Sequence, residues 1–385
     1  MDIEDYQAGY YRQQYKYKSF QPAEIDHAWE FSDAEVQQLL SEADRALGEL
    51  NAFSQLIPNV DFFIRMHIMK EATQSSRIEG TRTNMEDALL EEQDIEPEKR
   101  DDWVEVQNYI QAINQAIDQL ETLPLSSRLL KSTHHRLMQG ARGEGKLAGE
   151  FRTSQNWIGV SLRNAVFIPP HQDEVVALMS DLEKFLHNEE FKTPHLIKIA
   201  IAHYQFETIH PFLDGNGRLG RLMIALYLAS FGLLHKPALY LSDYFERNKT
   251  QYVDHLMAVR ESGNMRQWLI FFLYGVLETA QNSIQVFRDI IALKEKVERE
   301  VLPHFSARRQ GNVQTLMSHL YQQPITSIKN VEELLGTTTN TAASLVNDLV
   351  KYGVLSSPTS RRRNRIFWFE DYLLIFSRKH QNDQL

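Results

Sequence analysis

The amino-acid sequence predicts a mainly helical protein with small β elements. Apolar residues recur at three- and four-residue spacings over His195–Thr208 and again over 219–228, which predicts two packed helices. β-Branched and aromatic residues gather in two short runs, 157–160 and 166–168, around a polar tip, which predicts one β-hairpin. Residues 303–385 differ, because short helical runs there precede two strand-like runs. We therefore expect a helical body followed by a smaller α+β unit.

Composition places the chain among ordinary globular proteins. Its 385 residues are enough for two or three domains, and 43% hydrophobic with 24% charged residues excludes a disordered chain. It has no apolar run of about 18 residues and no signal-peptide pattern, so we expect no membrane span. The absence of cysteine excludes disulfides and thiolate metal sites and fits a cytoplasmic location. A net charge of −10 argues against nucleic-acid binding over the whole surface.

The expected organisation has three parts along the chain: 1–100, 101–300 and 301–385. Residues 1–31 are rich in tyrosine without a clear period, and we expect an arm that lies on the body. Ser32–Glu35 and Thr83–Glu86 match the capping box that begins a helix. Val104–Leu120 has the spacing of a long amphipathic helix within the second part.

The most informative segment runs from His210 to Arg221 and reads HPFLDGNGRLGR. It lies on the loop between the two predicted helices and on the first turn of the second helix. The first amides of a helix have no intrahelical partner and lie at its positive end, which favours a bound phosphate. Gly215 and Gly217 allow a positive φ and a close approach of the backbone to a ligand. The segment therefore predicts a phosphate site.

The charged side chains of this segment suit the same ligand. Arg218 and Arg221 share one helical face and offer two guanidinium groups to phosphate oxygens. Asp214 is a hard oxygen ligand of the kind that Mg²⁺ prefers when it bridges phosphates. His210 can accept a proton near neutral pH. Together they predict phosphoryl or nucleotidyl transfer with a base beside the phosphate.

Other interpretations of the segment are open. Gly215–Gly220 matches the dinucleotide fingerprint G-x-G-x-x-G, but that fingerprint requires a preceding strand and a later acidic residue. Here the preceding segment is predicted to be helical. A glycine-rich turn with solvated arginines, and a metal site made of His203, His210 and Asp214, are further alternatives.

The segment resembles the signature H-P-F-x-[DE]-G-N-G-R-x-x-R of the Fic family, enzymes that mostly transfer AMP from ATP to protein hydroxyls. Every fixed position is filled. The resemblance implies a Fic-type helical core in which His210 deprotonates a target Tyr, Thr or Ser hydroxyl and Asp214 holds Mg²⁺. Amides near Asn216 would form an anion hole, and the two arginines would bind the β- and γ-phosphates. The implied phosphate-binding set is Asn216, Gly217, Arg218, Gly220 and Arg221.

A second motif, Ser75–Gly80, reads SSRIEG and resembles the inhibitory pattern [ST]-x-x-x-E-[GN] of self-restrained family members. The run before it, 62–73, predicts a helix for which Gly80 would be the C-terminal stop. The resemblance implies that Glu79 pairs with Arg221 in the space of the γ-phosphate, because a carboxylate and a phosphate compete for one guanidinium. The alternative is a solvated residue near a helix end.

Two further segments fit the resemblance. In the family, a hairpin at the position of 157–168 is a flap that pairs with the extended target segment by strand addition. The alternative is a plain hairpin that covers the core. Residues 239–252 resemble stretches that help to bind the adenosine end of the nucleotide. Asn248 is the best candidate there, because an amide both donates and accepts. Tyr244 and Tyr252 lie four residues on either side on one predicted helical face, where they could stack on the nucleotide or belong to the core.

The C-terminal part resembles a winged helix in its order of elements. The expected order is helices at 313–321, 331–335 and 341–352, strand 354–355, turn 356–365 and strand 366–369. Residues 303–385 hold ten Lys or Arg and six Asp or Glu. The turn could meet DNA phosphates through Arg361, Arg362, Arg363 and Arg365. Helix 341–352, however, carries Lys351 as its single base and also Asp348. We therefore favour protein docking or dimerisation, with DNA binding as the alternative.

The motifs from Ser75 to Tyr252 together predict a self-inhibited protein adenylyltransferase. It would use ATP and Mg²⁺, modify a hydroxyl of a protein or of itself, and form a homodimer in the cytoplasm. Two alternatives remain. One is another Fic chemistry, such as AMP removal or transfer of phosphate or phosphocholine. The other is a nucleotide-sensing regulator that binds DNA through the C-terminal part.

Overall fold

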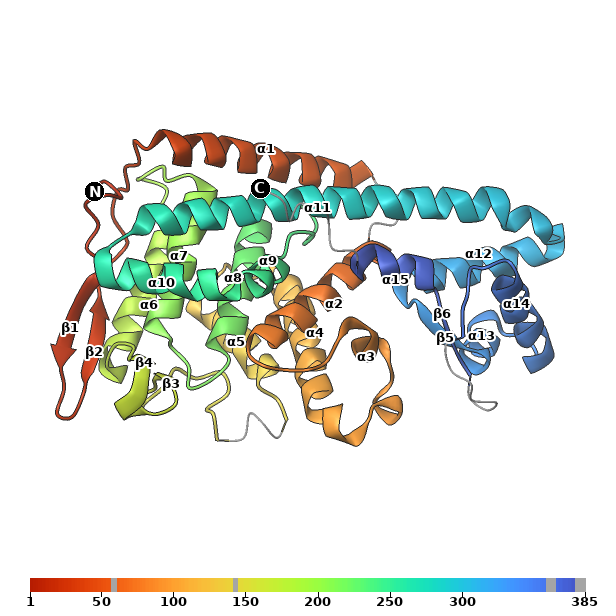
Figure 1. The fold of residues 1–385 in the computed structure, drawn as a ribbon, viewed down its shortest axis with the longest axis horizontal. Coiled ribbons are helices and arrows are strands. Elements are labelled where there is room, and N and C mark those ends of the chain that lie inside the picture. The colour runs from red at the N-terminus through yellow and green to blue at the C-terminus, as the bar shows by residue number, and fades with distance from the viewer. Residues whose placement is uncertain (57–60, 141–144, 358–364, 378–385) are drawn as a thin grey trace.

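The computed structural model describes residues 1–56, 61–140, 145–357 and 365–377 and is mainly helical, as predicted (Figure 1). Its α-helices are α1 Ala34–Leu56, α2 Asp61–Ile78, α3 Met85–Leu89, α4 Arg100–Leu120, α5 Ser127–Leu137, α6 Val175–His187, α7 His195–Ile209, α8 Asn216–Ser230, α9 Ser242–Arg247, α10 Lys249–Ser262, α11 Met265–Glu300, α12 Ala307–Gln322, α13 Ile328–Leu335, α14 Thr339–Lys351 and α15 Glu370–Ser377. The strands are β1 Gly9–Gln13, β2 Lys18–Pro22, β3 Ile158–Gly159, β4 Ala165–Phe167, β5 Ile325–Ser327 and β6 Ile366–Trp368.

The pair of helices α7 and α8 forms the centre of the body. Every residue of α7 after His195 is buried, and so is the run Arg218–Leu228 of α8. A helix that is buried on all sides belongs to the core rather than to the surface. The helices α2, α4, α5, α6 and α11 pack around this pair. The loop between α7 and α8, which carries the polar motif, is thereby fixed at both ends by buried helices.

Helix α11 connects the body to the C-terminal part. Its 36 residues correspond to a length of about 54 Å at the usual rise of an α-helix. Helix α1 packs along it, and the two lie side by side across one face of the molecule (Figure 1). The C-terminal elements follow at the far end of α11 (Figure 1).

The first 31 residues contact the body and contain a hairpin that the sequence pattern did not indicate. Strands β1 and β2 form an antiparallel hairpin in which Gly9 pairs with Pro22 and Gln13 with Lys18. Phe20 of β2 is buried, and its amide donates to the carbonyl of Ile168 at 2.9 Å, just after β4. The polar turn of this hairpin lacks the Gly, Asn or Asp that usually marks one, so the packing of its aromatic residues decides the structure.

Two helix starts lie one residue later than predicted. The cap of α1 is Asp33, whose Oδ1 accepts from the amide of Val36 at 2.9 Å. The cap of α3 is Asn84, whose Oδ1 accepts from the amide of Asp87 at 2.7 Å. Asp and Asn are at least as good as Ser and Thr at this position. Val104–Leu120 lies inside α4, and the predicted hairpin forms from β3 and β4, as expected.

The C-terminal part contains the predicted helices, but its strands pair differently. Residues 354–355 form no strand; β6 instead pairs with β5, which the sequence did not indicate, and Ser356 makes one bridge to Trp368. Helix α15 was also missed. β5 has three residues and ends where Ser327 caps α13, so it is too short to show a periodic pattern. Arg361, Arg362 and Arg363 lie outside the described residues, and Arg365 lies over the ring of Phe367.

No helix in the described part of the chain is both long and apolar enough to cross a membrane.

Candidate active site

His210 occupies the turn that ends α7. Its backbone is left-handed, with φ 51° and ψ 59°, and its amide still donates to the carbonyl of Phe206 at 2.9 Å. Pro211 follows and has no amide hydrogen with which to continue the helix. The chain therefore turns sharply at His210 and projects this side chain from the end of a buried helix.

Two side chains from the segment before β3 hold this turn in place. Arg152 is buried; its Nε donates to the carbonyl of His210 at 3.0 Å and its Nη2 to that of Pro170 at 2.6 Å. Nδ2 of Asn156 donates to the carbonyl of His210 at 3.2 Å and to that of Phe212 at 2.9 Å. Sequence reasoning missed both residues. The sequence offered one signal, the charged side chain of Arg152 in the short segment before the predicted hairpin, and this signal did not indicate which group Arg152 would contact.

The rest of the loop is closed by Asn216 and His134. Oδ1 of Asn216 accepts from the amide of Phe212, and its Nδ2 donates to the carbonyl of the same residue, both at 2.8 Å. The side chain of Asn216 is therefore used within the loop, and its backbone amide is the group that can face a ligand. Nδ1 of His134 accepts from the amide of Gly149, so its Nε2 donates to the carbonyl of Asp214 at 2.9 Å.

The surroundings of His210 favour the neutral imidazole. Burial and then the positive charges of Arg260 and Arg152 lower the pKa of His210 to about 4, while the charge of Glu79 acts in the opposite direction. Its Nδ1 is buried and has no hydrogen-bond partner within the described part of the chain. A histidine that is neutral at physiological pH is able to accept a proton.

The N-terminus of α8 points into the same site. The first intrahelical bond runs from the amide of Leu219 to the carbonyl of Gly215, so the amides of residues 216–218 precede the helical ladder. Gly215 is left-handed, with φ 75°, as the turn into the helix requires. A Cβ on Gly217 would collide with Oε1 of Glu79, and one on Gly220 would collide with Oε1 of Glu207 in α7. Gly220 therefore serves helix packing, whereas Gly217 leaves room for an oxygen ligand.

Glu79 contacts Arg221, as the resemblance implied. Its Oε1 accepts from Nη2 of Arg221 at 2.7 Å, and Arg221 also donates from Nε and Nη2 to Oγ and the carbonyl of Ser75, both at 2.9 Å. Burial would raise the pKa of Glu79, but the charge and the hydrogen bond of Arg221 lower it below its usual value. A carboxylate therefore lies against Gly217 at the positive end of α8, where an anion is favoured.

Helix α2, which ends just before Glu79, is anchored along its length. Glu71 is buried and accepts from the hydroxyls of Tyr109 at 2.8 Å and Ser242 at 2.6 Å. Lys70 pairs with Asp243 at 3.4 Å, and Lys249 donates to the carbonyl of Ile78 in the last turn of α2. These contacts to α4, α9 and α10 fix where Glu79 lies.

Arg218 has a different carboxylate partner. Its Nη1 donates to Oε1 of Glu105 in α4 at 2.7 Å, and its Nη2 lies 3.7 Å from Oδ1 of Asp214. A cavity of about 260 Å³ lies in front of these groups and is lined by residues including Glu79, Glu105, Met138, Asp214 and Arg218. Arg218, one of the predicted phosphate ligands, and Asp214, the predicted metal ligand, thus line one cavity together with Glu79.

Asp214 fits the chemistry of a magnesium ligand supported by phosphates. Its side chain is 45% exposed and faces this cavity. The described residues contain no group of three or more His, Cys, Asp or Glu that could hold a metal by themselves. This argues against the alternative site of His203, His210 and Asp214, and His203 is instead bonded to the hydroxyl of Tyr252 and the carbonyl of Gly220. Mg²⁺ commonly takes one or two carboxylates and completes its shell with phosphates and water.

The candidate adenosine residues do not share one helix. The helical structure is interrupted at Asn248, which lies between α9 and α10. Nδ2 of Asn248 donates to the carbonyl of Tyr244 at 2.9 Å. Tyr244 and Tyr252 are both buried; Tyr244 packs against Gly275 and Phe271, and Tyr252 against Phe245. The expectation of one helical face is wrong, because Asn248 has non-helical backbone angles. Both tyrosines belong to the core in this state.

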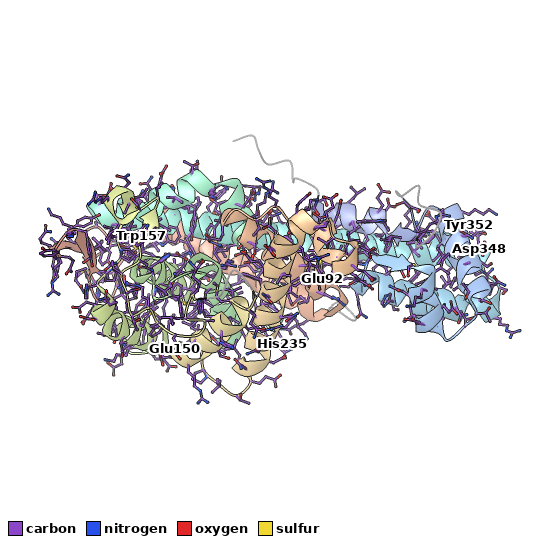
Figure 2. The ribbon with its side chains drawn as sticks, turned by 90° about the horizontal axis from the view of Figure 1, so that it is seen from below. Glu92, Glu150, Trp157, His235, Asp348 and Tyr352 are labelled. Atoms are coloured by element: carbon purple, nitrogen blue, oxygen red, sulfur yellow. The ribbon has the colours of Figure 1, made fainter. Side chains whose placement is uncertain are left out.

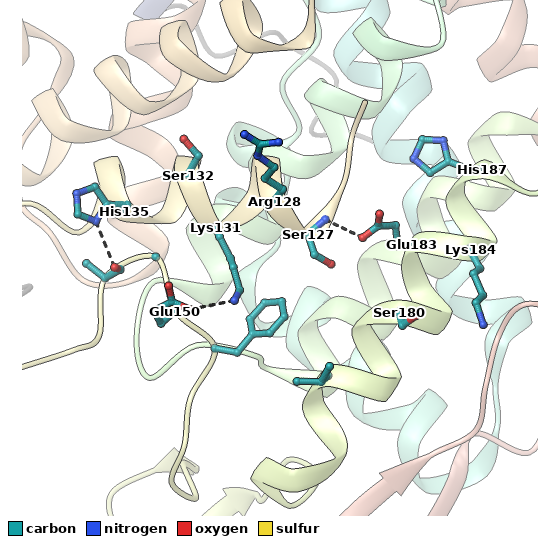
Figure 3. A pocket seen from close by; sticks show the side chains of 14 residues that line it. Ser127, Arg128, Lys131, Ser132, His135, Glu150, Ser180, Glu183, Lys184 and His187 are labelled. Carbon is teal, nitrogen blue, oxygen red and sulfur yellow. Dashed lines mark hydrogen bonds and ion pairs between the residues drawn. The ribbon is translucent and has the colours of Figure 1, made fainter. Parts of the chain in front are cut away.

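A larger groove lies elsewhere on the molecule. It has a volume of about 840 Å³, lies over α5 and α6, and is lined by Lys131, Glu150, Lys184 and neighbouring residues (Figure 3). None of the predicted site residues lines it. We locate the candidate active site at the smaller cavity, because His210, Glu79 and the arginines gather beside it.

The comparisons with known proteins agree with this site. The model of the Fic/DOC family N-terminal region matches residues 37–118, and that of the Fic/DOC family matches residues 124–228. The protein adenylyltransferase Fic of Drosophila yakuba is 32% identical over 124 residues, which are 32% of this chain and 22% of that protein. Its counterpart in Drosophila melanogaster is also 32% identical over 124 residues, 23% of its length. The match thus spans less than a quarter of these relatives.

Solved structures share the fold. A Fic family protein from Desulfovibrio desulfuricans G20 superposes with a TM-score of 0.55 at 20% identity, over 88% of this chain and 96% of that chain. A Fic domain containing signaling protein from Bacteroides thetaiotaomicron VPI-5482 gives a TM-score of 0.50 at 17% identity, over 66% of this chain and 96% of that chain. The matched models show that residues 37–228 of this chain hold the N-terminal region and the Fic domain of the Fic/DOC family, and the solved structures share its fold.

Proposed function

We propose that this protein transfers AMP from ATP to a Tyr, Thr or Ser hydroxyl of a protein, itself included, and that Glu79 restrains the reaction. One observation carries the proposal: His210, which ends α7, interacts electrostatically with Glu79, and Glu79 lines one cavity together with Arg218 and Asp214. The names of the relatives in Drosophila support transfer of an adenylyl group. A base beside an anion site is what such a transfer requires.

In the proposed reaction His210 accepts the proton of the target hydroxyl. The hydroxyl oxygen then bonds to the α-phosphorus of ATP, the bond from that phosphorus to the bridging oxygen breaks, and pyrophosphate leaves. Arg152 and Asn156 keep the imidazole oriented by holding the carbonyl of His210. The amides at the start of α8 stabilise negative charge on the phosphate oxygens. Positioning and charge stabilisation supply most of the acceleration.

The side chains around α8 would hold the rest of the nucleotide. Arg218 and Arg221 would bind the β- and γ-phosphates, and Asp214 would hold Mg²⁺, which neutralises charge on the triphosphate when it is bound. Gly217 would allow the triphosphate to approach the helix, because any larger residue would fill that space. Asn248 remains the candidate for the adenosine end.

Glu79 restrains the reaction in this proposal because it occupies the guanidinium that ATP needs. Its carboxylate takes one Nη of Arg221 and covers Gly217. Nucleotide can bind productively only when this carboxylate leaves. The contact is seen in the structure, and its inhibitory effect is the proposal.

The test is to incubate wild type, Glu79→Gly and His210→Ala with Mg²⁺ and ATP and to record the intact mass of each. We expect one adenylyl group or more on Glu79→Gly, little on wild type and none on His210→Ala. An adduct that persists on His210→Ala would contradict the role of this base. If no variant gains mass, the same assay is repeated with cell extract and labelled ATP, and a lack of labelled protein there would refute the proposed activity.

A further inference from the structure

Exposed apolar side chains gather on two adjacent hairpins. Among the described residues, six of the thirteen exposed large hydrophobic side chains belong to β1–β2 or to β3–β4 and its approach. We name this set the hairpin surface: Tyr10, Tyr11, Tyr15, Trp157, Val160 and Val166. Tyr15 and Val160 are 94% and 91% exposed. Apolar side chains that gather in this way mark an interaction site, whereas scattered ones do not.

The two hairpins are packed together. Phe20 of β2 lies 5.8 Å from Phe167 of β4 between ring centres, and its amide donates to the carbonyl of Ile168. The hydroxyl of Tyr17 donates to Oε1 of Gln155 at 3.3 Å. Both hairpins lie at the same end of the molecule (Figure 1), and Trp157 lies at that end in the second view (Figure 2). The two hairpins that carry the hairpin surface are therefore joined to each other by an aromatic contact and hydrogen bonds.

The hairpin surface is basic although the whole chain is acidic. Residues 6–23 contain Arg12, Lys16 and Lys18 and no acid, and residues 151–172 contain no acid and, apart from the buried Arg152, one arginine, Arg163, while the chain carries a net charge of −10. Lys16, Lys18 and Arg163 are exposed. Two carboxylates from outside these segments come close: Glu174 pairs with Arg12 at 3.2 Å, and Glu261 lies near Tyr11.

The hairpin surface is mechanically linked to His210. The segment that leads into β3 holds the carbonyl of His210 through Arg152 and Asn156. The guanidinium of Arg260 lies 3.9 Å from the ring centre of Phe167 in β4, and its Nε and Nη2 donate to Oγ1 of Thr208 and the carbonyl of Glu207 at the end of α7, both at 3.1 Å. A segment bound on the hairpin surface is thus held in a fixed relation to the candidate base.

The family resemblance implies that the β3–β4 hairpin docks an extended segment of the protein substrate. We infer that the β1–β2 hairpin extends this docking site, and that the docked segment is acidic and carries aromatic or β-branched side chains. The naming of this segment as substrate rests on the proposed function. An extended segment fits because alternate side chains can meet the exposed tyrosines and valines. An acidic one fits because exposed lysines attract carboxylates and because the rest of this acidic chain repels them.

The test measures binding apart from catalysis. Full-length His210→Ala is titrated, by fluorescence anisotropy, into labelled peptides of equal length and equal Tyr and Val content that carry either glutamates or lysines. We expect the glutamate peptide to bind about tenfold tighter, and the preference to weaken with salt. Lys16→Glu with Lys18→Glu is expected to abolish the preference. The matched control, Arg45→Glu with Arg308→Glu, makes the same charge change at exposed positions on α1 and α12 and is expected to keep it. Equal binding of the two peptides, or an equal loss in the control, would overturn the inference.

A transfer assay separates this inference from the proposed function. In the Glu79→Gly background, the double substitution Lys16→Glu with Lys18→Glu is expected to raise the KM for an acidic protein substrate and to leave kcat unchanged. If the peptides show the charge preference and no AMP is transferred, the docking surface stands and the proposed function falls. If AMP is transferred with equal KM by the reversed variant, the docking inference falls alone.

Discussion

The two arginines of α8 each contact a glutamate from an N-terminal helix, and the two pairs differ in how firmly they are built. Glu105 lies in the middle of α4 with a side chain that is 12% exposed. Glu79 lies in the turn after the end of α2 with a side chain that is 40% exposed. Both arginines are themselves almost fully buried. The carboxylates have the same chemistry and differ in their exposure and in the element that holds them.

In the proposed function, this difference makes the pair of Glu79 and Arg221 a brake and the pair of Glu105 and Arg218 a support. Glu79 follows the last residue of α2, so helical hydrogen bonds constrain its backbone on the N-terminal side only. The next residue is Gly80, whose φ of 105° is a conformation that favours glycine. Departure of the Glu79 carboxylate would leave Arg221 held by Ser75 and open to a phosphate. Glu105 is more deeply buried within α4, and in the proposed function it orients Arg218 toward the cavity. We therefore expect opposite consequences when the two glutamates are changed.

The largest expected effect comes from removing Glu79. Glu79→Gly is expected to raise adenylyl transfer by about 10- to 100-fold, since a hydrogen bond to a charged group contributes about 1.5–3 kcal/mol. The measurement is the initial rate of transfer at subsaturating ATP. The control is Glu98→Gln, which removes the charge of an exposed glutamate a short distance further along the chain and is expected to leave the rate unchanged. A rate equal to wild type in Glu79→Gly would refute the brake.

Removal of the charge of Glu105 sharpens the comparison. Glu105→Gln keeps an acceptor for Arg218 but weakens its orientation, so in the Glu79→Gly background we expect the KM for ATP to rise by less than about tenfold. Isothermal titration with ATP and Mg²⁺ in the added background of His210→Ala measures the dissociation constant of ATP without turnover, and it is expected to rise in the same way. Activation by Glu105→Gln would show that both glutamates compete with the nucleotide, and the distinction between brake and support would fail.

The pH dependence of transfer tests how the base is kept neutral. His210 must be unprotonated to accept a proton, so activity is expected to be complete well above its pKa of about 4 and to fall as the pH approaches that value. Arg260→Met removes a positive charge that lowers the pKa of His210. The loss of activity at low pH, which is the acid limb of the pH–rate profile, is therefore expected to begin about one pH unit higher. Arg260→Lys keeps the charge and is expected to leave the limb in place. An unchanged limb in Arg260→Met would contradict this electrostatic role.

A third carboxylate near Arg221 provides the smallest effect. Glu207 is buried, its Oε1 has no partner in the described part of the chain, and burial raises its pKa to about 7. The folded state therefore retains a proton that the unfolded chain loses near pH 4.5, and stability falls as the pH rises from there to about 7. Glu207→Gln is expected to gain on the order of 2 kcal/mol over wild type between pH values of about 5 and 8. Denaturant unfolding of both proteins at the two pH values measures this gain in the free energy of unfolding. An equal change in both proteins between the two pH values would contradict the predicted role of Glu207.

The sequence predicted the centre of this site because its chemistry is local. The helices on both sides of His210, the glycines and the two arginines lie in one short segment, and their spacing already places them at a helix N-terminus. The contact between Glu79 and Arg221 came from the family resemblance, since no local pattern links residues so far apart. The structure now shows that contact directly.

The supporting residues could not be predicted, because their roles depend on distant contacts. Arg152, Asn156 and Arg260 act through backbone carbonyls of the α7 end that they reach only in the folded chain. The β1–β2 hairpin has a polar turn without turn-forming residues, so its aromatic packing was invisible to pattern reasoning. The interruption of the helix at Asn248 likewise depends on the packing of α9 on α2, because the sequence there contains no proline or glycine.

The most direct test of the account is a double-mutant cycle on ATP binding. The dissociation constant of ATP with Mg²⁺ is measured for wild type, Glu79→Gly, Arg221→Ala and the double variant. We predict that Glu79→Gly tightens binding by about tenfold or more when Arg221 is present and has no such effect when Arg221 is absent, because the two groups compete through one guanidinium. An equal gain in both backgrounds, or none in either, would contradict the claim that Glu79 occupies the phosphate site on Arg221.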